Sequence, residues 1–586
     1  MESAEGRVLL QVGFGLGEAF LQVWHRCAEG DPPLHFIALT RHPPTAEALR
    51  QAHRGSALQP LADELAALWP PLTPNLHLLS VGGARVQLLL GVGEPLHLLP
   101  QLQARVHEMR VDEFDAAQDP THALRRLARG LARLAAPQAT LQAPARLQAL
   151  QPALAAAGFA VAPGTDELRA TYQPAFQPRG RQARPGSRPE RHALIVGAGL
   201  AGCATAWALA GQGWRSTLID RADAPANQGS GNPAGLFHGI VTPQDGAHAR
   251  FNRAAALLAQ RTVQRAVASG MVRGSASGLL RLDTRGLDAS VLNEELARLQ
   301  LPADYVQALD AASASERCGL RLRHPAWFYP GGGWVQPAVL ARWMLQQAGD
   351  AVHFRGSLDV QTLAEREGRW QLLDATGKPL AEGRTVVLAN ASNALRLAAA
   401  THWPVQSVRG QISVCTSASS ACPRTWPRLP IAGAGYLLPE LDGEVLFGAS
   451  AHPGDQAAEL READHRFNLQ RLALLSPEFE GWRPDSWSGR VGWRCVSDDR
   501  LPLVGAVPDE SALAGTAVER LDQVPRRTGL FMFSALGSRG ISWAALGAQV
   551  LAARISGAPV PLESSLLEAL DPARFALRSA RRAPRG

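Results

Sequence analysis

The segment ALIVGAGLAGCATAWALAGQGWRSTLID, residues 193–220, decides the fold of most of the chain. A short apolar strand leads into the glycine pattern GxGxxG, and a helix and a second apolar strand follow. In this pattern the first glycine permits a tight turn, the second lets the backbone approach a pyrophosphate, and the third lets the helix pack closely on the strand. The glycines are Gly197, Gly199 and Gly202. We therefore predict a dinucleotide site, with the amides that start the helix directed at the phosphates.

An acidic residue ends the second strand of this segment. Asp220 follows Gly199 at a spacing that suits a carboxylate accepting hydrogen bonds from ribose hydroxyls. A carboxylate at this position favours an unphosphorylated ribose, so FAD or NAD fits better than NADP. Because strand, glycines, helix, second strand and acid occur in register, the pattern is far more specific than an isolated GxGxxG.

Two further segments favour FAD over NAD. The small-residue loop SGNPAG (230–235) follows the second strand, and GLFMFSALGSRGISWAALGAQVLAARI (529–555) is predicted to form a strand, a glycine turn and a helix. Backbone amides in such a turn can face the electron-rich edge of a ring. A glycine turn that returns to the cofactor from the far end of the chain is typical of flavin oxidases. We expect cofactor contacts at Ser230, Gly231, Asn232, Gly235, Gly537, Ser538 and Gly540.

The chain has 586 residues, too many for one ordinary hydrophobic core, so two or three domains are expected. Its first part alternates apolar strands with helical patterns. The predicted strands are 7–12, 34–39 and 85–92, and the predicted helix is 122–134. Strands that alternate with helices indicate an α/β sheet, which we expect to occupy residues 1–172.

The domain boundaries follow from composition. Residues 173–191 are rich in Pro, Arg and Gly and too poor in apolar residues to build a core, so we expect a linker. A second α/β pattern, expected to be the FAD domain, runs over 192–576. The basic stretch 577–586 is expected to be an unstructured tail.

Composition also limits the function. The chain lacks an uninterrupted apolar run of about 18 residues, so we expect no membrane span, and its polar start is unlike a signal peptide. Six cysteines without a CxxC pair fit a reducing cytoplasm, and we expect no metal site. The net charge of +7 is compatible with an anionic partner such as nucleic acid. The excess is almost all arginine, with Lys378 the only lysine, so compositional drift explains it equally well.

A series of motifs in the second part resembles one family. In order, these are SGNPAG, GGGWVQP (331–337), VRGQIS (408–413), GYLLP (435–439), FGAS (447–450), DRLPLVGAVPD (499–509) and ALGSRG (535–540). Together they resemble the flavin half of the bifunctional tRNA 5-methylaminomethyl-2-thiouridine biosynthesis (MnmC) proteins. The resemblance implies a glycine-oxidase-like, DAO-type FAD-binding domain with an α+β substrate domain. The expected fold class is thus α/β, with a Rossmann-like, methyltransferase-type domain fused in front of it.

The resemblance also implies a substrate, a carboxymethylaminomethyl group on the wobble uridine of tRNA. Oxidation of its glycine-like arm releases glyoxylate and leaves an aminomethyl uridine. The substrate carboxylate calls for a guanidinium. Arg494 lies where related amine oxidases place a carboxylate-binding arginine, and Arg539 in the flavin-facing turn is the second candidate. A structural ion pair is the alternative for either. Some relatives use a lysine to activate oxygen, but we expect Lys378 to lie in a surface turn.

The first 172 residues resemble the methyltransferase half of the same family, which uses S-adenosylmethionine. The matching segments are GFGLGEAF (13–20), LHFIALTRHP (34–43), RVQLLLGVGE (85–94) and VDEFDAAQDP (111–120). The resemblance implies that Asp112 is catalytic and that the donor is bound by Gly13, Gly15, Gly17 and Glu94.

Several positions depart from the family pattern. Thr40 stands where the family has the acid that ends the second strand and binds the donor ribose. Gln11 stands where the family has the acid before the glycine loop. Glu113 and Ala116 replace the glycine and the proline that the family has near the catalytic aspartate. The family's opening segment has no counterpart before Met1. Each charged hydrogen bond that is lost forfeits about 1.5–3 kcal/mol. We expect weak methyl transfer, or a domain retained for docking or for holding tRNA.

Two other functions are compatible with the sequence. The chain could be an FAD-dependent oxidase of free glycine, sarcosine or D-amino acids, or a nucleic-acid-binding protein that keeps a flavin for structure. The fused front domain favours the tRNA enzyme over the first alternative. The intact FAD motifs argue against the second.

Overall fold

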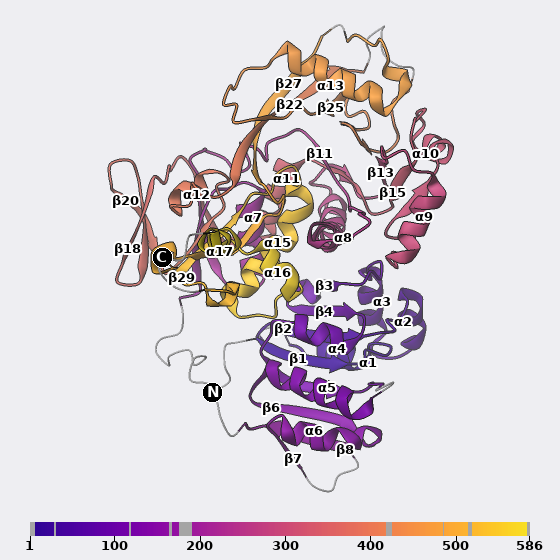
Figure 1. Ribbon diagram of the computed structural model, residues 1–586, viewed down its shortest axis with the longest axis vertical. Helices are drawn as coiled ribbons and strands as arrows, with labels where there is room; N and C mark the ends of the chain where they lie inside the picture. The colour runs from indigo at the N-terminus through magenta and orange to yellow at the C-terminus, as the bar shows by residue number, and fades with distance from the viewer. Residues whose placement is uncertain are drawn as a thin grey trace. The chain divides into compact units, whose positions relative to one another are not determined.

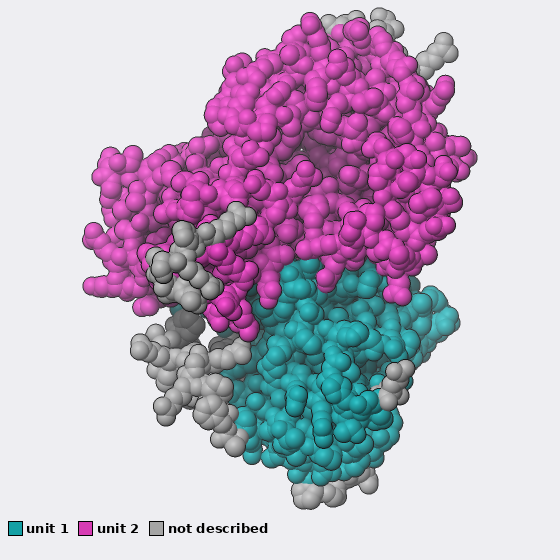
Figure 2. All heavy atoms as spheres, in the orientation of Figure 1, with its two compact units in different colours: residues 1–191, 211–213, 552–567 teal, residues 192–210, 214–551, 568–586 magenta. Residues whose placement is uncertain are grey.

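The computed structural model forms two compact units, coloured separately in Figure 2. Unit 1 comprises residues 1–191, 211–213 and 552–567, and unit 2 comprises 192–210, 214–551 and 568–586. The residues that the structure describes are 6–28, 31–115, 119–162, 167–174, 190–417, 425–484, 486–513 and 518–582. Most of the expected linker, residues 175–189, lies outside this set, as do Ala116 and Cys422.

Unit 1 is built on a sheet that, in its described residues, has eight strands in the order β3-β4-β2-β1-β5-β6-β8-β7. The run β4-β2-β1-β5-β6 is parallel, and β3, β8 and β7 join it antiparallel. The strands are β1 (Arg7–Val12), β2 (Leu34–Thr40), β3 (Leu76–Val81), β4 (Val86–Val92), β5 (Val106–Val111), β6 (Ala135–Pro144), β7 (Phe159–Val161) and β8 (Glu167–Tyr172). The helices are α1 (Glu18–His25), α2 (Ala46–Ala52), α3 (Gln59–Ala67), α4 (Pro95–Leu98), α5 (Pro120–Leu134) and α6 (Gln151–Ala156).

The sheet of unit 1 is covered on both faces. Alternate residues of β1 enter two different apolar clusters, with Leu10 in one and Leu9 in the other, and every residue of β2 is buried. Continuous apolar strands of this kind are typical of parallel sheets with helices on both sides. The predicted strands β1, β2 and β4 and the predicted helix α5 are confirmed. Strands β3 and β5 to β8 were not predicted.

A late segment of the chain packs in unit 1. Residues 552–567 belong to it by their contacts. Val560 donates its amide to the Gln103 carbonyl at 2.9 Å, and Glu563 accepts the Leu76 amide at 3.2 Å. Both Val560 and Glu563 are buried. The fold of unit 1 is therefore completed by residues 552–567, which come after most of unit 2 in the sequence.

Unit 2 contains the predicted dinucleotide sheet, in the order β17-β10-β9-β21-β29-β28. All neighbours are parallel except β28, which is antiparallel to β29. The elements are β9 (His192–Val196), α7 (Leu200–Ala210), β10 (Arg215–Ile219), α11 (Pro337–Ala348), β17 (Val352–Arg355), β21 (Thr385–Leu388), α12 (Asn393–Leu397), β28 (Leu503–Pro508), α14 (Glu510–Leu513), β29 (Arg526–Ser534), α15 (Gly540–Ser556) and α17 (Ala573–Arg582). The last turn of α15 and the first turn of α16 (Ser564–Leu570) belong to unit 1. The predicted strand, glycine turn and helix near the end of the chain are β29 and α15.

A second, mostly antiparallel sheet in unit 2 forms the α+β part (Figure 1). Its order is β14-β15-β13-β23-β24-β25-β22-β26, with β27 also paired to β22. The elements of this part are α8 (Ala247–Ala268), β13 (Leu279–Leu282), α9 (Ala289–Arg298), β14 (Gln307–Leu309), α10 (Ala311–Cys318), β15 (Ala326–Tyr329), β22 (Val405–Thr416), β23 (Ile431–Ala432), β24 (Tyr436–Leu437), β25 (Glu444–Gly448), β26 (His452–Pro453), α13 (Glu462–Leu475) and β27 (Ser488–Ser497). Two small sheets are formed by β11 (Gly235–Phe237), β16 (Gly333–Val335) and β12 (Gly274–Ser275), and by β18 (Thr362–Arg366), β19 (Arg369–Leu373) and β20 (Pro379–Gly383).

A buried ion pair fastens α13 to the second sheet, against which the helix lies in Figure 1. Arg409 of β22 donates to Asp464 of α13 at 2.6 Å, and both residues are almost completely buried. Burial opposes ionisation of Asp464, but the hydrogen bonds from Arg409 and His452 outweigh it and hold the pKa of that carboxyl below its usual range. Removing one partner of such a pair destabilises the fold, because it leaves a buried charge uncompensated.

The end of the chain is more ordered than expected. Helix α17 continues to Arg582, so the prediction of an unstructured tail is wrong for residues 577–582. The apolar residues Phe575, Ala576 and Leu577 are buried and fix this helix to unit 2. None of the helices in the described ranges has the length and apolar character needed to cross a membrane.

Candidate active site

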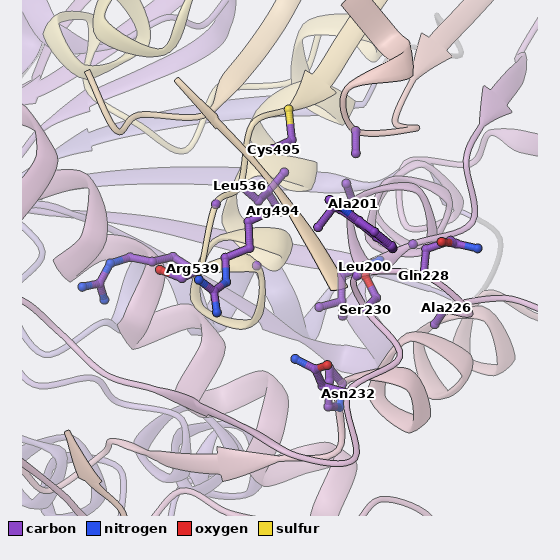
Figure 3. Close-up of a pocket in the computed structure, with 18 of the residues that line it drawn as sticks. Leu200, Ala201, Ala226, Gln228, Ser230, Asn232, Arg494, Cys495, Leu536 and Arg539 are labelled. Atoms are coloured by element: carbon purple, nitrogen blue, oxygen red, sulfur yellow. Dashed lines mark hydrogen bonds between the residues drawn. The ribbon is translucent and has the colours of Figure 1, made fainter. Parts of the chain in front are cut away.

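Unit 2 contains a cavity of about 830 Å³, drawn in Figure 3. One end is formed by loops that follow the parallel strands β9, β10 and β21, together with the loop 226–236. The other end is formed by β27, the turn between β29 and α15, and residues of the second sheet. Ligands of open α/β sheets bind in this position, outside the carboxyl ends of the strands.

The three glycines of the first loop occupy different positions. Gly197 has a φ of +105°, and a Cβ atom there would lie 2.7 Å from the backbone of Ala389. A Cβ at Gly202 would lie 1.8 Å from the Gly197 carbonyl oxygen, so only glycine allows α7 to approach the strand. A Cβ at Gly199 would meet only the Ser230 hydroxyl, at 3.2 Å, because Gly199 faces the cavity.

Hydrogen bonds hold the walls of this end. Asp220 accepts the Ala198 amide at 2.6 Å and the Ala222 amide at 2.8 Å, and its carboxylate lines the cavity. The Ser230 hydroxyl accepts the amide of Leu200, the first residue of α7, at 3.0 Å. The loop 226–236 is thereby joined to the start of the helix.

Arg490 of β27 supports the same loop from behind. It donates to the Asn232 side chain at 3.1 Å and to the Gln228 carbonyl at 2.7 Å. A Cβ at Gly231 would lie 2.6 Å from the Arg490 guanidinium, so Gly231 contacts this support and is not part of the cavity wall.

Arg494 and Arg539 both line the other end of the cavity. Figure 3 shows their side chains on one side of it and Gln228 on the opposite side. The hydrogen bond recorded for the Arg494 guanidinium is long, 3.4 Å to the Ser450 carbonyl. Neither arginine has a carboxylate partner within the described part of the chain: the charged or ionisable neighbours are Tyr436 for Arg494, and Arg281, Tyr329 and Tyr305 for Arg539. The alternative of a structural ion pair is therefore not found for either residue.

The charges at this end are poorly compensated. Burial lowers the pKa of Arg494, and burial together with the nearby Arg281 guanidinium lowers the pKa of Arg539 to about 10. Both guanidiniums still carry a positive charge at neutral pH. Buried cations without acidic partners are costly and mark a binding site for an anion.

Several polar residues of the cavity were not predicted from the sequence, among them an arginine, a histidine, an asparagine and a tyrosine. Arg281 lies in the apolar strand β13, His238 follows β11, Asn390 follows β21, and Tyr436 begins β24. The pKa of His238 is far below its usual value because the ring is buried and faces Arg539 and Arg281, so His238 is neutral. Burial raises the pKa of Tyr436 to about 12, so its hydroxyl keeps its proton. A charged residue inside an apolar strand was the available signal for Arg281.

Most of the expected residues of unit 2 are brought together. Those that line the cavity are Gly197, Gly199, Asp220, Ser230, Asn232, Gly235, Arg494, Gly537, Ser538, Arg539 and Gly540. Gly202 and Gly231 lie behind the wall. Lys378 is exposed in the turn between β19 and β20, as expected.

Unit 1 contains a smaller cavity of about 380 Å³ at the carboxyl ends of β1 and β5. This is the topological switch point of the sheet, because the strand order reverses between these two strands. Gly13, Gly15 and Asp112 line it, and Gln11 donates to the Asp112 carboxylate at 2.6 Å. The Gln11 side-chain oxygen is buried without a hydrogen-bond partner among the described residues.

Other residues expected at this cavity lie elsewhere. Gly17 and Glu94 are not part of its wall, and Glu94 forms an ion pair with Arg41. Thr40 is buried at the end of β2, where its hydroxyl accepts the His42 amide at 3.2 Å.

The fold and the larger cavity define a class, the FAD-dependent oxidoreductases, and residues 192–554 match the family DAO, FAD dependent oxidoreductase. The chain is 46% identical, over 97% of its length and 90% of the relative, to the tRNA 5-methylaminomethyl-2-thiouridine biosynthesis bifunctional protein MnmC of Methylibium petroleiphilum. It is 39% identical, over 98% of its length and 90% of the relative, to the protein of that name from Burkholderia mallei. The chain therefore belongs to the MnmC family of bifunctional proteins.

Solved structures show the fold of unit 2 in other proteins. Glycine oxidase from Geobacillus kaustophilus superposes with a TM-score of 0.51 at 21% identity, covering 65% of this chain and 98% of that protein. L-proline dehydrogenase from P. horikoshii gives a TM-score of 0.51 at 15% identity, covering 66% and 98%. The predicted glycine-oxidase-like, DAO-type fold is confirmed.

Replacement of Gly199 tests the cofactor end of the cavity. The variant Gly199→Leu is expected to fold, since its side chain enters the cavity, but to be purified without FAD because the side chain blocks the approach of a pyrophosphate. The visible spectrum and chromatography of the released cofactor measure this. Gly246→Leu, at a glycine with open space around it, is the matched control and should be yellow. A colourless wild-type protein that binds NADH contradicts the assignment.

Proposed function

We propose that the chain modifies the wobble uridine of tRNA by FAD-dependent oxidative removal of the carboxymethyl arm of 5-carboxymethylaminomethyl-(2-thio)uridine. The observation that carries the proposal is the pair Arg494 and Arg539, two guanidiniums without acidic partners at the end of the cavity opposite the glycine loop. Membership of the MnmC family supports the tRNA substrate, and the reaction then belongs in the cytoplasm.

The residues of the cavity fit FAD. Gly199 and the start of α7 offer backbone amides to a pyrophosphate, and Asp220 offers a carboxylate to a ribose. The side-chain oxygen of Asn390 is buried in the wall with no partner among the described residues, so it is ready to accept a hydrogen bond. Ser538 and the start of α15 bring further amides to the opposite end, whereas the Gly537 amide is already donated to the Cys495 carbonyl at 2.9 Å.

Bound FAD supplies a two-electron acceptor for the C–H bond beside the amine, and hydrolysis of the resulting imine releases glyoxylate and the aminomethyl uridine. The chain positions this bond. Arg494 binds the carboxylate of the arm through two parallel hydrogen bonds, which fixes the CH2 group at the cofactor. Because neighbouring cations disfavour a further positive charge, the arginines hold the secondary amine neutral. A neutral amine carries the lone pair that the oxidation requires.

The methyl transfer that follows in the family belongs to unit 1. Amides of the loop 13–17 fit the carboxylate of S-adenosylmethionine, and the Gln11 oxygen and Asp112 fit its amine or the acceptor amine. Neither Thr40 nor Glu94 supplies a carboxylate for the donor ribose at the cavity. We propose that this chain binds the donor weakly and that methyl transfer is much slower than oxidation.

The role of Arg494 is tested by a conservative change. Arg494→Lys is expected to lower kcat/KM for the carboxymethyl substrate more than tenfold, because a lysine cannot form the bidentate contact that orients the arm. Arg520→Lys, at an exposed ion pair with Asp522, is the control and should retain wild-type turnover. Steady-state kinetics with modified tRNA measure both. An unchanged kcat/KM in Arg494→Lys removes this residue from the site.

Calorimetry with S-adenosylmethionine tests the front unit. We expect weak or undetectable binding, because the loss of a charged hydrogen bond to the ribose costs about 1.5–3 kcal/mol. Oxidation by the same preparation should be intact. Micromolar binding, with methylation of aminomethyl-uridine tRNA that is lost in Asp112→Ala, would overturn this proposal and make both halves fully active.

A further inference from the structure

Arg281 is the third arginine at the substrate end of the larger cavity. It lies in β13, paired with Trp327 on one side and with Ala432 on the other. Its neighbours Leu280 and Leu282 are buried in an apolar cluster, whereas Arg281 lines the cavity together with Ala432. The alternation of a strand thus directs Arg281 away from the core and into the site.

Arg281 has no acidic partner among the described residues. The nearest acid in sequence, Asp283, is bound by Arg285 at 2.6 Å. Arg281 lowers the pKa of both Arg539 and His238, so its guanidinium is close to theirs. The acids that line the cavity follow strands of the dinucleotide sheet, at its cofactor end: Asp220 after β10 and Asp359 after β17. The substrate end therefore carries a positive charge that the protein does not neutralise.

One carboxylate does not account for this charge. The arm of the proposed substrate has a single carboxylate, and a bidentate contact with Arg494 satisfies it. Arg281 lies on β13, between β15 and β23, whereas Arg494 lies on β27, which pairs with β22, so the two arginines come from separate strands of the second sheet. A partly buried guanidinium that stays unpaired is costly, so its retention at the cavity points to a second anion on the same ligand.

We propose that Arg281 binds a phosphate group of the substrate nucleotide and so makes the cavity select a nucleotide over a free amino acid. The inference rests on the proposed function and adds to it a specificity-determining residue. A nucleotide in RNA and a free nucleoside monophosphate both carry the required phosphate. Glycine, sarcosine and other small amines carry only the group that Arg494 binds.

Kinetics with matched substrates test the proposal on the FAD-loaded enzyme. We expect the wild type to oxidise 5-carboxymethylaminomethyluridine monophosphate with a kcat/KM about tenfold or more above that of the nucleoside, the gain of one charged hydrogen-bonded contact. In Arg281→Met this ratio should fall to about twofold or less, and in Arg281→Lys it should be intermediate. Arg273→Met, which removes an exposed arginine paired with Asp442, should keep the wild-type ratio.

Modified tRNA distinguishes the two sources of phosphate. If Arg281→Met lowers kcat/KM for tRNA as much as for the monophosphate, the site takes a phosphodiester of RNA. If only the monophosphate is affected, the site takes a terminal phosphate. Equal losses for nucleoside, monophosphate and tRNA would overturn the proposal, because Arg281 would then serve the arm that all three share.

A binding measurement separates this inference from the proposed function. Inorganic phosphate should perturb the flavin absorbance of the wild-type and Arg273→Met proteins with a saturable dependence, and Arg281→Met should weaken that binding at least fivefold. If no uridine substrate is oxidised but phosphate binding still requires Arg281, the proposed function fails and the anion site stands. Phosphate binding that is the same in Arg281→Met and wild type contradicts the site. Thermal unfolding of each variant checks that the fold is retained.

Discussion

Helix α7 approaches the Gly197 carbonyl so closely that a Cβ atom on Gly202 would lie 1.8 Å from that oxygen, and the cofactor end of the active site depends on this approach. The close packing brings the first amides of α7 to the cavity wall. It also sets the turn whose Ala198 amide is held by Asp220, which directly follows the neighbouring strand β10. The close contact between Gly202 and Gly197 therefore brings the start of α7, Asp220 and Gly199 to the cofactor end of the cavity.

The opposite end of the cavity depends on charge. Arg494 comes from β27, Arg539 from the turn before α15, and Arg281 from β13, so three distant segments deliver guanidiniums to one region. Burial and the nearby Arg281 guanidinium lower the pKa of Arg539 to about 10. Burial, together with Arg539 and Arg281, holds the pKa of His238 far below its usual value, so the ring is neutral. This arrangement is unfavourable in the protein alone. An anionic substrate that carries an amine resolves it, because the anion neutralises the guanidiniums while the remaining cationic field keeps the amine unprotonated.

The site residues that could be predicted from the sequence are mainly those that lie close together along the chain. The glycine loop, α7 and Asp220 lie within one continuous segment, so their spacing in sequence determines their geometry. Arg494 and Arg539 were located through the family resemblance and not through periodicity. Arg281 and Asn390 were missed because the pairing of β13 with β23 and the position of β21 in the sheet are set by long-range contacts. Glu94 was expected at the smaller cavity, but its side chain pairs with Arg41.

Both ends of the larger cavity serve one reaction, the oxidation of the carboxymethyl arm on tRNA. The most direct measurement incubates the purified, FAD-loaded protein with tRNA bearing the carboxymethylaminomethyl nucleoside, and follows nucleosides by mass spectrometry and glyoxylate by derivatisation. We expect this nucleoside to be lost, and the aminomethyl nucleoside and glyoxylate to appear in equal amounts. Unchanged tRNA, from a preparation that oxidises free glycine or sarcosine, would contradict it and identify a small-molecule amine oxidase.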